Sequence, residues 1–225
     1  KALTASEVLE KMATAYKKAS SYSDFGSVHL DAEMAKDKIK LAADFSVKMV
    51  RPDKLHVEAN QGVLVTDGKQ WNAWIRNLPG QFVSRDAPAH LGLETIFADN
   101  VLFQALTQGF PGEIPELTLM TPQLVLLLKD NPLKEMLQDC KNLSLLEPGK
   151  VGDHECYRVQ AQWTQGDAVF WVDKKTFALR RMVLPANMLE QAFGGKDQVK
   201  SLSLVADFSG AELNGAVDPK AFEFE

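Results

Sequence analysis

The residue types best suited to chemistry in this chain are four histidines, two cysteines and 30 acidic residues. The histidines are spread along the chain, at His29, His56, His90 and His154. None has a second histidine four positions away, the spacing with which one face of a helix binds a metal ion. Cys140 and Cys156 do not form a CxxC pair, which a thioredoxin-like redox site would need. The sequence therefore predicts no metal ion and no cofactor.

The run Asp153-His154-Glu155 places a base between two acids, the groups that general acid–base catalysis uses. It directly follows Gly152 at a predicted hairpin turn, where polar residues are common for reasons of turn geometry alone. A GxSxG nucleophile elbow, a Walker A phosphate loop and a GxGxxG dinucleotide loop are all absent from the sequence. We therefore interpret the chain as non-enzymatic.

A carbohydrate hydrolase is the least favoured alternative. It would need two carboxylates in a cleft with aromatic side chains that stack on sugars. The aromatic side chains large enough for this are Trp71, Trp74, Trp163 and Trp171. The same tryptophans suit an apolar core equally well. Because Trp71 and Trp74 are three positions apart, they face opposite sides of a strand.

Alternation of apolar and polar residues predicts the elements that position these groups. Between Phe25 and Arg76 the period is two, and after Leu143 the alternation returns. The clearest run has apolar side chains at Ile39, Leu41, Ala43, Phe45, Val47 and Met49. Such strands have one dry face and one wet face. Short turns, including an Asp67-Gly68 hairpin signal, imply antiparallel neighbours. We expect one sheet of about ten strands, five of them in a meander over 25–76 and the rest over 143–225.

Helical signals flank and interrupt the strands. Thr4 and Glu7 form a T-x-x-E capping box for an N-terminal helix over 4–20. The segment 86–140 is apolar and helical in rhythm, with a first helix over Pro88–Phe97. Thr121 is a predicted N-cap with Pro122 at the first helical position, and Asn131 and Pro132 form the same arrangement at the start of a further helix. A one-sided sheet with a helical cover in a single domain over 1–225, of α+β class, is the predicted fold.

Composition limits the partners and the location. The net charge is −5 and there is no basic run, which excludes nucleic acid as a partner. No apolar stretch reaches the length of about 18 residues that a membrane-spanning helix requires. The two cysteines leave a disulfide and two free thiols both open. The abundant apolar residues fit a close-packed core, and they fit the lining of a ligand cavity equally well.

Three short motifs carry a family resemblance. The segment Val169–Arg181 resembles the "hydrophobic–Trp–Val–Asp, turn, Leu–Arg" strand pair of LolA-like lipoprotein carrier proteins. Val217–Phe224 is similar to the closing "Asp-Pro-x-x-Phe-x-Phe" of that superfamily, and Asp67–Trp71 to its "Asp-Gly-x-x-hydrophobic" hairpin. The motifs occur in the family's order over nearly the whole chain.

The resemblance implies a strongly curved, incomplete β-barrel with helices covering its concave face. It also implies a periplasmic or cell-envelope location after export, and an acyl chain of a lipid or lipoprotein as the ligand. An envelope protein is a possible further partner. Arg51 and Arg76 are candidates for the arginine that carriers use near the acyl site. Some members of the superfamily are fused to other domains.

We predict that an apolar cavity between the sheet and a helical lid over 86–140 holds the ligand. Its predicted lining is Phe45, Val47, Trp71, Ile75, Leu93, Phe97, Leu102, Leu127, Val159 and Trp171. The alternative is a structural or protein-interaction module whose interior is filled by its own side chains. Detection of a bound lipid would favour the ligand-binding hypothesis over the interaction module.

Overall fold

The computed structural model describes residues 2–78, 80, 82–98, 106, 121–164, 166–185, 190, 195 and 198–224. The strands of its 12-stranded sheet are β1 (Ser21–Met34), β2 (Lys38–Val50), β3 (Lys54–Ala59), β4 (Gly62–Thr66), β5 (Gln70–Ile75), β6 (Phe82–Asp86), β7 (Asn142–Val151), β8 (His154–Trp163), β9 (Gly166–Asp173), β10 (Leu179–Leu184), β11 (Val199–Asp207) and β12 (Glu212–Leu213). The described helices are α1 (Ala5–Lys18), α2 (Leu93–Phe97), α4 (Pro122–Leu128), α5 (Pro132–Met136) and the 3-10 helix η4 (Pro219–Phe222).

The sheet consists of two antiparallel meanders joined in the middle. Strands β1 to β6 follow one another in space, as do β7 to β11, and β1 pairs with β11 to join the two sets. The sheet is open, with β6 and β7 at its edges among the described strands, and β12 pairs with β1 beside the main path. The predicted five-strand meander is confirmed. The prediction that the sheet ends after β5 is wrong, because the chain reverses there and β6 pairs with β5.

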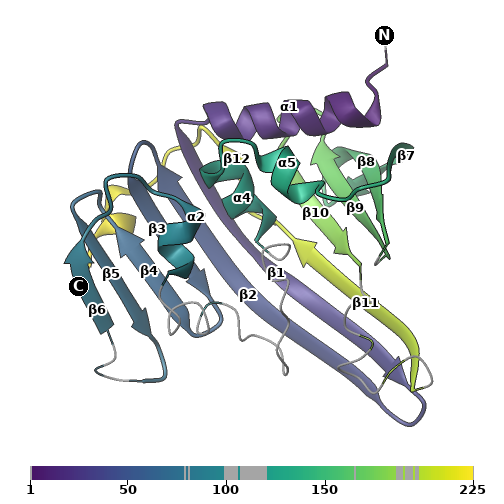
Figure 1. The fold of residues 1–225 in the computed structure, drawn as a ribbon, viewed down its shortest axis with the longest axis horizontal. Helices are drawn as coiled ribbons and strands as arrows, with labels where there is room; N and C mark the ends of the chain where they lie inside the picture. Colours follow the sequence, from purple (N-terminus) through teal and green to yellow (C-terminus); the bar gives the residue numbers. More distant parts are fainter. Residues whose placement is uncertain are drawn as a thin grey trace.

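The two faces of the sheet differ in polarity as the alternation predicts. Leu30 on β1 lies between Leu41 of β2 and Leu204 of β11. One position further along, Asp31 on the opposite face pairs with Lys40. The helices lie on the face that carries Leu30, as Figure 1 shows for α1, α2, α4 and α5. We call this the inner face and the opposite one the outer face.

Helix α1 forms as its sequence predicts. The Thr4 hydroxyl accepts a hydrogen bond from the Glu7 backbone, and the Glu7 carboxylate accepts one from the Thr4 backbone. This reciprocal capping box satisfies two of the N–H groups that a helix N-terminus leaves free. The apolar stripe of α1 is fully buried against the sheet and the other helices, at Val8, Leu9, Met12 and Tyr16.

The helical block over 86–140 differs from its prediction. The helix expected over Pro88–Phe97 begins only at Leu93, after an extended Gly92 N-cap. Thr121 occupies the predicted N-cap of α4, but its hydroxyl makes no capping bond and is buried without a hydrogen-bond partner in the described part of the chain. Helices α4 and α5 have 7 and 5 residues. No helix among the described residues is long and apolar enough to cross a membrane. Cys140 and Cys156 are both free thiols.

A buried carboxyl group, Asp24, lies on the inner face at the start of β1. The Tyr22 hydroxyl donates a hydrogen bond of 2.9 Å to Asp24 Oδ2, while Oδ1 has no hydrogen-bond partner among the described residues. The ring of Tyr22 lies 5.3 Å from that of Tyr16 on α1, and the positive charge of Arg180 acts on the carboxyl group. Burial raises the pKa of Asp24 to about 7, because water no longer stabilises its charged form.

This pKa predicts a pH-dependent stability. Since the folded pKa is raised, the folded protein binds a proton more readily than the unfolded chain between about pH 4 and pH 7. The free energy of unfolding should therefore fall as the pH rises through that window. The neutral variant Asp24→Asn should lose this slope and be more stable than wild type at pH 8 by about 2–4 kcal/mol. Urea unfolding of both proteins at pH 5 and pH 8 measures this difference in stability.

Asp44→Asn provides the control, because Asp44 is exposed on the outer face of β2. Its unfolding free energy should follow that of wild type at both pH values. If the free energies of unfolding of Asp24→Asn and wild type change with pH in the same way, the buried carboxyl group is not the cause of the pH dependence.

Candidate functional site

Along β2, the inner face is fully buried at one end and half-buried at the other, whereas the β1 residues beside it, Val28, Leu30 and Ala32, are buried. Along β2, Val47 and Met49 are buried, whereas the inward residues that precede them keep partial contact with solvent. We call the half-buried set the inner strip; it comprises Ile39, Leu41, Ala43, Phe45 and Leu202 of β11. From Ile39 to Phe45 it is about 20 Å long at the usual rise per residue. Figure 1 shows the far ends of β1, β2 and β11 reaching beyond α1, α4 and α5.

One end of the inner strip is formed by the ring of Phe45. This ring crosses Gly26 of β1, where a Cβ atom would lie 2.5 Å from Phe45 and 2.0 Å from the Asp207 carbonyl oxygen. Glycine is therefore required at this position for Phe45 to reach Phe208, whose ring centroid lies 5.6 Å away. The strip thus continues directly into the buried core.

The structure brings most of the predicted lining residues to the inner face. Val47, Trp71, Leu93, Leu127 and Val159 are buried in one apolar cluster. Phe45, Ile75 and Phe97 are half-buried, and Leu102 lies outside the described residues. Trp71 is 1% exposed, and the Arg85 guanidinium lies 5.2 Å from its ring centroid. Whether this set binds a ligand stays a prediction.

Trp171 is placed apart from the others. It pairs with Arg158 and Arg181 on the outer face, and their guanidinium groups lie 4.5 and 5.8 Å from its ring centroid. Phe170, one position earlier, is the inward residue and is fully buried. The sequence could have predicted that Trp171 faces outward, because Phe170 and Val172 are two positions apart and therefore point to the same, inner face.

Arg51 and Arg76 lie in different surroundings. Arg51 Nε donates to the Ala19 carbonyl at 3.0 Å, and its Nη2 donates to the Leu127 carbonyl at 2.9 Å. These carbonyls lie at the C-terminal ends of α1 and α4, where a positive charge is favourable. Arg76 pairs instead with Glu58 at the surface. Of the two candidate arginines, Arg51 is the one beside the helices that cover the inner face.

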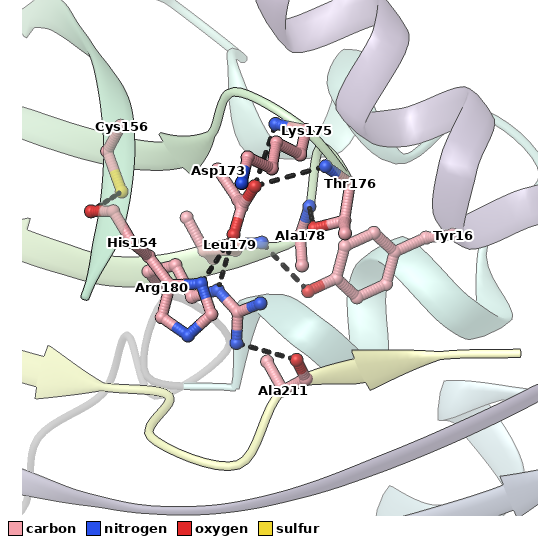
Figure 2. Close-up of polar contacts among 10 residues, drawn as sticks. All are labelled: Tyr16, His154, Cys156, Asp173, Lys175, Thr176, Ala178, Leu179, Arg180 and Ala211. Carbon is pink, nitrogen blue, oxygen red and sulfur yellow. Dashed lines mark hydrogen bonds and ion pairs between the residues drawn. The ribbon is translucent and has the colours of Figure 1, made fainter. Parts of the chain in front are cut away.

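The residues that look most like a catalytic cluster are organised by Asp173 (Figure 2). Its Oδ1 accepts hydrogen bonds from the backbone N–H groups of Lys175 and Thr176, at 2.8 and 3.1 Å. Its Oδ2 accepts one from Arg180 Nε at 3.1 Å and lies 2.9 Å from His154 Nδ1. Burial opposes the charge on Asp173, but these bonds and the guanidinium outweigh it and hold its pKa below the usual range.

The contacts of this cluster tie the turn after β9 to Arg180 of β10 and His154 of β8. The Asp173–His154 pair resembles the acid–base part of a hydrolase, which also needs a nucleophile. The nearest thiol is Cys156, and burial raises its pKa to about 11, so that it stays protonated. Its Sγ donates to the His154 carbonyl, not to the imidazole. Across the described part of the chain, no group of three or more His, Cys, Asp or Glu side chains could hold a metal ion.

Comparison with known proteins gives matches to solved structures only. No family model and no curated protein matches this chain. LprF from Mycobacterium bovis aligns over 95% of this chain and 94% of its own, with 10% identity and a TM-score of 0.46. A LolA superfamily protein from Nitrosomonas europaea aligns over 99% of both chains, with 12% identity and a TM-score of 0.26. The lipoprotein LppX from Mycobacterium tuberculosis aligns over 94% of this chain and 95% of its own, with 10% identity and a TM-score of 0.35.

Identities of 10–12% leave the function of this chain to be argued from its own residues.

Removal of the Asp173 carboxylate tests its structural role. Asp173→Ala leaves the buried Arg180 guanidinium without a counter-charge and frees two turn N–H groups, and we expect it to lower the free energy of unfolding by about 3–5 kcal/mol. Asp167→Ala, on the exposed end of the same strand, should change it by about 0.5 kcal/mol or less. Urea unfolding monitored by circular dichroism compares the two. If both variants lower the free energy of unfolding by the same small amount, the Asp173 carboxylate does not stabilise the folded protein.

Proposed function

We propose that this chain is a non-enzymatic cell-envelope protein that binds an acyl chain of a lipid or lipoprotein on the inner strip, next to the helices that cover the rest of the inner face. The supporting observation is the strip itself, an apolar row about 20 Å long that is half-buried and continuous with the core. A ligand laid along it would remove the remaining apolar surface from water. The envelope location rests on the sequence resemblance.

The energetics of such a site need no charged anchor. Each methylene group transferred from water to an apolar surface contributes about 0.8 kcal/mol, so a long acyl chain supplies enough favourable free energy by itself. The outward neighbours of the strip along β2 are polar or small, at Lys38, Lys40, Ala42 and Asp44. An acyl chain therefore distinguishes the two faces of the same strand by apolar contact alone.

The alternative hypothesis, a protein-interaction module, is supported by the edge strand β6. Phe82 and Val83 on this strand are 58% and 42% exposed, and they point to opposite faces of the sheet. An edge strand with exposed apolar side chains offers free backbone groups that can pair with a strand of another protein. This hypothesis requires no ligand on the inner face.

Native mass spectrometry with palmitate tests the acyl-chain proposal. The wild-type protein purified without detergent should retain or take up a fatty-acid mass that organic extraction identifies. Leu41→Gln, which places a carboxamide on the inner strip, should weaken palmitate binding about tenfold. The matched control is Ala42→Gln, on the outer face of the same strand, which should bind as wild type does.

Either of two results would overturn the proposal. An unmodified mass after incubation with palmitate and lysolipids would favour the protein-interaction module. Equal losses of binding in Leu41→Gln and Ala42→Gln would move the ligand away from the inner strip.

A further inference from the structure

A pocket opens on the outer face, on the side of the sheet away from the inner strip. Its volume is about 680 Å³, within the range typical of small-molecule sites. Its floor is the outer face of β3, β5 and β6, and its wall is the segment 219–224. The lining comprises Lys54, Asp67, Gln70, Asn72, Ser84, Pro219, Phe222, Glu223 and Phe224. We call it the outer pocket.

The C-terminal segment is held on the outer face by specific contacts. His56 Nδ1 lies 2.7 Å from the Ala221 carbonyl oxygen, which fixes η4 over β3. Phe222 is buried, and the Lys54 ammonium lies 5.9 Å from its ring centroid. The ring of Phe224 lies 5.4 Å from that of Trp74 on β5. The wall of the outer pocket is therefore ordered by the fold itself.

Asn72 is the feature that marks the outer pocket as a binding site. Its side chain is only 7% exposed and lines the pocket, and its carboxamide makes no hydrogen bond to any described residue. Its neighbours on the outer face are Val65 of β4 and Ser84 of β6. Its oxygen and nitrogen atoms are not among the buried polar atoms that lack a partner, so the carboxamide reaches water only through the pocket. A polar ligand in the pocket would replace that water as its hydrogen-bond partner.

The other polar groups define what such a ligand must offer. The Ser84 hydroxyl makes no hydrogen bond, and Lys54 no ion pair, within the described ranges. Asp67 Oδ1 accepts bonds from the N–H groups of Gln70 and Lys69, which hold the pKa of Asp67 below its usual range and keep it ionised. Donors and acceptors therefore surround the same space.

The balance of charge excludes the simplest charged ligands. Among the described residues that line the pocket, two carboxylates, Asp67 and Glu223, face one ammonium, Lys54, so that a phosphate or sulfate group meets net repulsion. A plain amine would leave Lys54 without a partner and bring two positive charges together. An acyl chain would bury the Asn72 carboxamide and the Lys54 ammonium unpaired.

We propose that the outer pocket binds a neutral sugar, a mono- or disaccharide. A sugar hydroxyl both donates and accepts hydrogen bonds, which matches the mixed set formed by Asn72, Ser84, Lys54 and Asp67. The exposed ring of Phe224 provides an apolar wall for the C–H face of the sugar, and the buried Phe222 supports that wall. This site uses residues on the face opposite to the inner strip, so it is independent of the acyl-chain proposal.

Saturation-transfer NMR on the full chain tests the proposal, with methyl glucoside, methyl galactoside and N-acetylglucosamine as probes at about 5 mM. At least one sugar should receive saturation from the protein. Asn72→Leu keeps the side-chain size and removes the carboxamide, and it should weaken that binding at least about tenfold. Ser84→Val, at an exposed position, should weaken it about threefold or more. Ser203→Val, exposed on the outer face of β11, is the matched control and should bind as wild type does.

Three outcomes would overturn the proposal. One is the absence of saturation transfer to all three sugars from the folded wild-type protein. A second is sugar binding that Ser84→Val and a folded Asn72→Leu both leave unchanged. The third is a chemical-shift titration in which inorganic phosphate displaces the sugar, because the charge argument excludes that anion. If Asn72→Leu does not fold, the test is the comparison of sugar binding between Ser84→Val and Ser203→Val.

Discussion

The Asp173 carboxylate lies where three strands and the loop before β12 meet, and both of its oxygens are used. One fixes the turn after β9 through two backbone N–H groups, and the other binds Arg180 of β10 and approaches His154 of β8. Arg180 in turn donates to the Ala211 carbonyl at 2.7 Å, just before the strand that pairs with β1. Because a buried guanidinium without a carboxylate is strongly unfavourable, this ion pair links the positions of these elements in the folded protein.

Helix α1 depends on the same junction. The Tyr16 hydroxyl accepts a hydrogen bond of 3.1 Å from the Leu179 backbone, next to Arg180, and Arg51 binds the carbonyl groups at the end of the helix. The helix therefore covers one end of the inner face rigidly, and α4 is tied to it through Arg51. Apolar side chains further along β2 and β11 lie beyond this fixed cover. The proposed acyl-chain site follows from where the junction places the helices.

Alternation predicted the faces of the strands well, because burial on one side of a sheet leaves a period of two in the sequence. It predicted that Trp71 and Trp74 face opposite sides, and the structure confirms this. Helix bounds over 86–140 were predicted less well, because short helices such as α2 depend on tertiary packing more than on local signals. The role of Asn72 could not be predicted, because residues 219–224 complete its pocket from the far end of the chain.

The two proposed sites lie on opposite faces of the sheet and on different strands, the inner strip on β2 and β11 and the floor of the outer pocket on β3, β5 and β6. On β5, Trp71 and Ala73 point to the inner face, and Asn72 and Trp74 point to the outer face. The inner face is apolar and is covered by helices, whereas the outer face on this side carries a polar floor beneath a short C-terminal wall. Because adjacent residues serve opposite faces, one sheet can present an apolar surface on one side and a hydrogen-bonding surface on the other. The chemistry of each face therefore follows from which of the alternating side chains points to it.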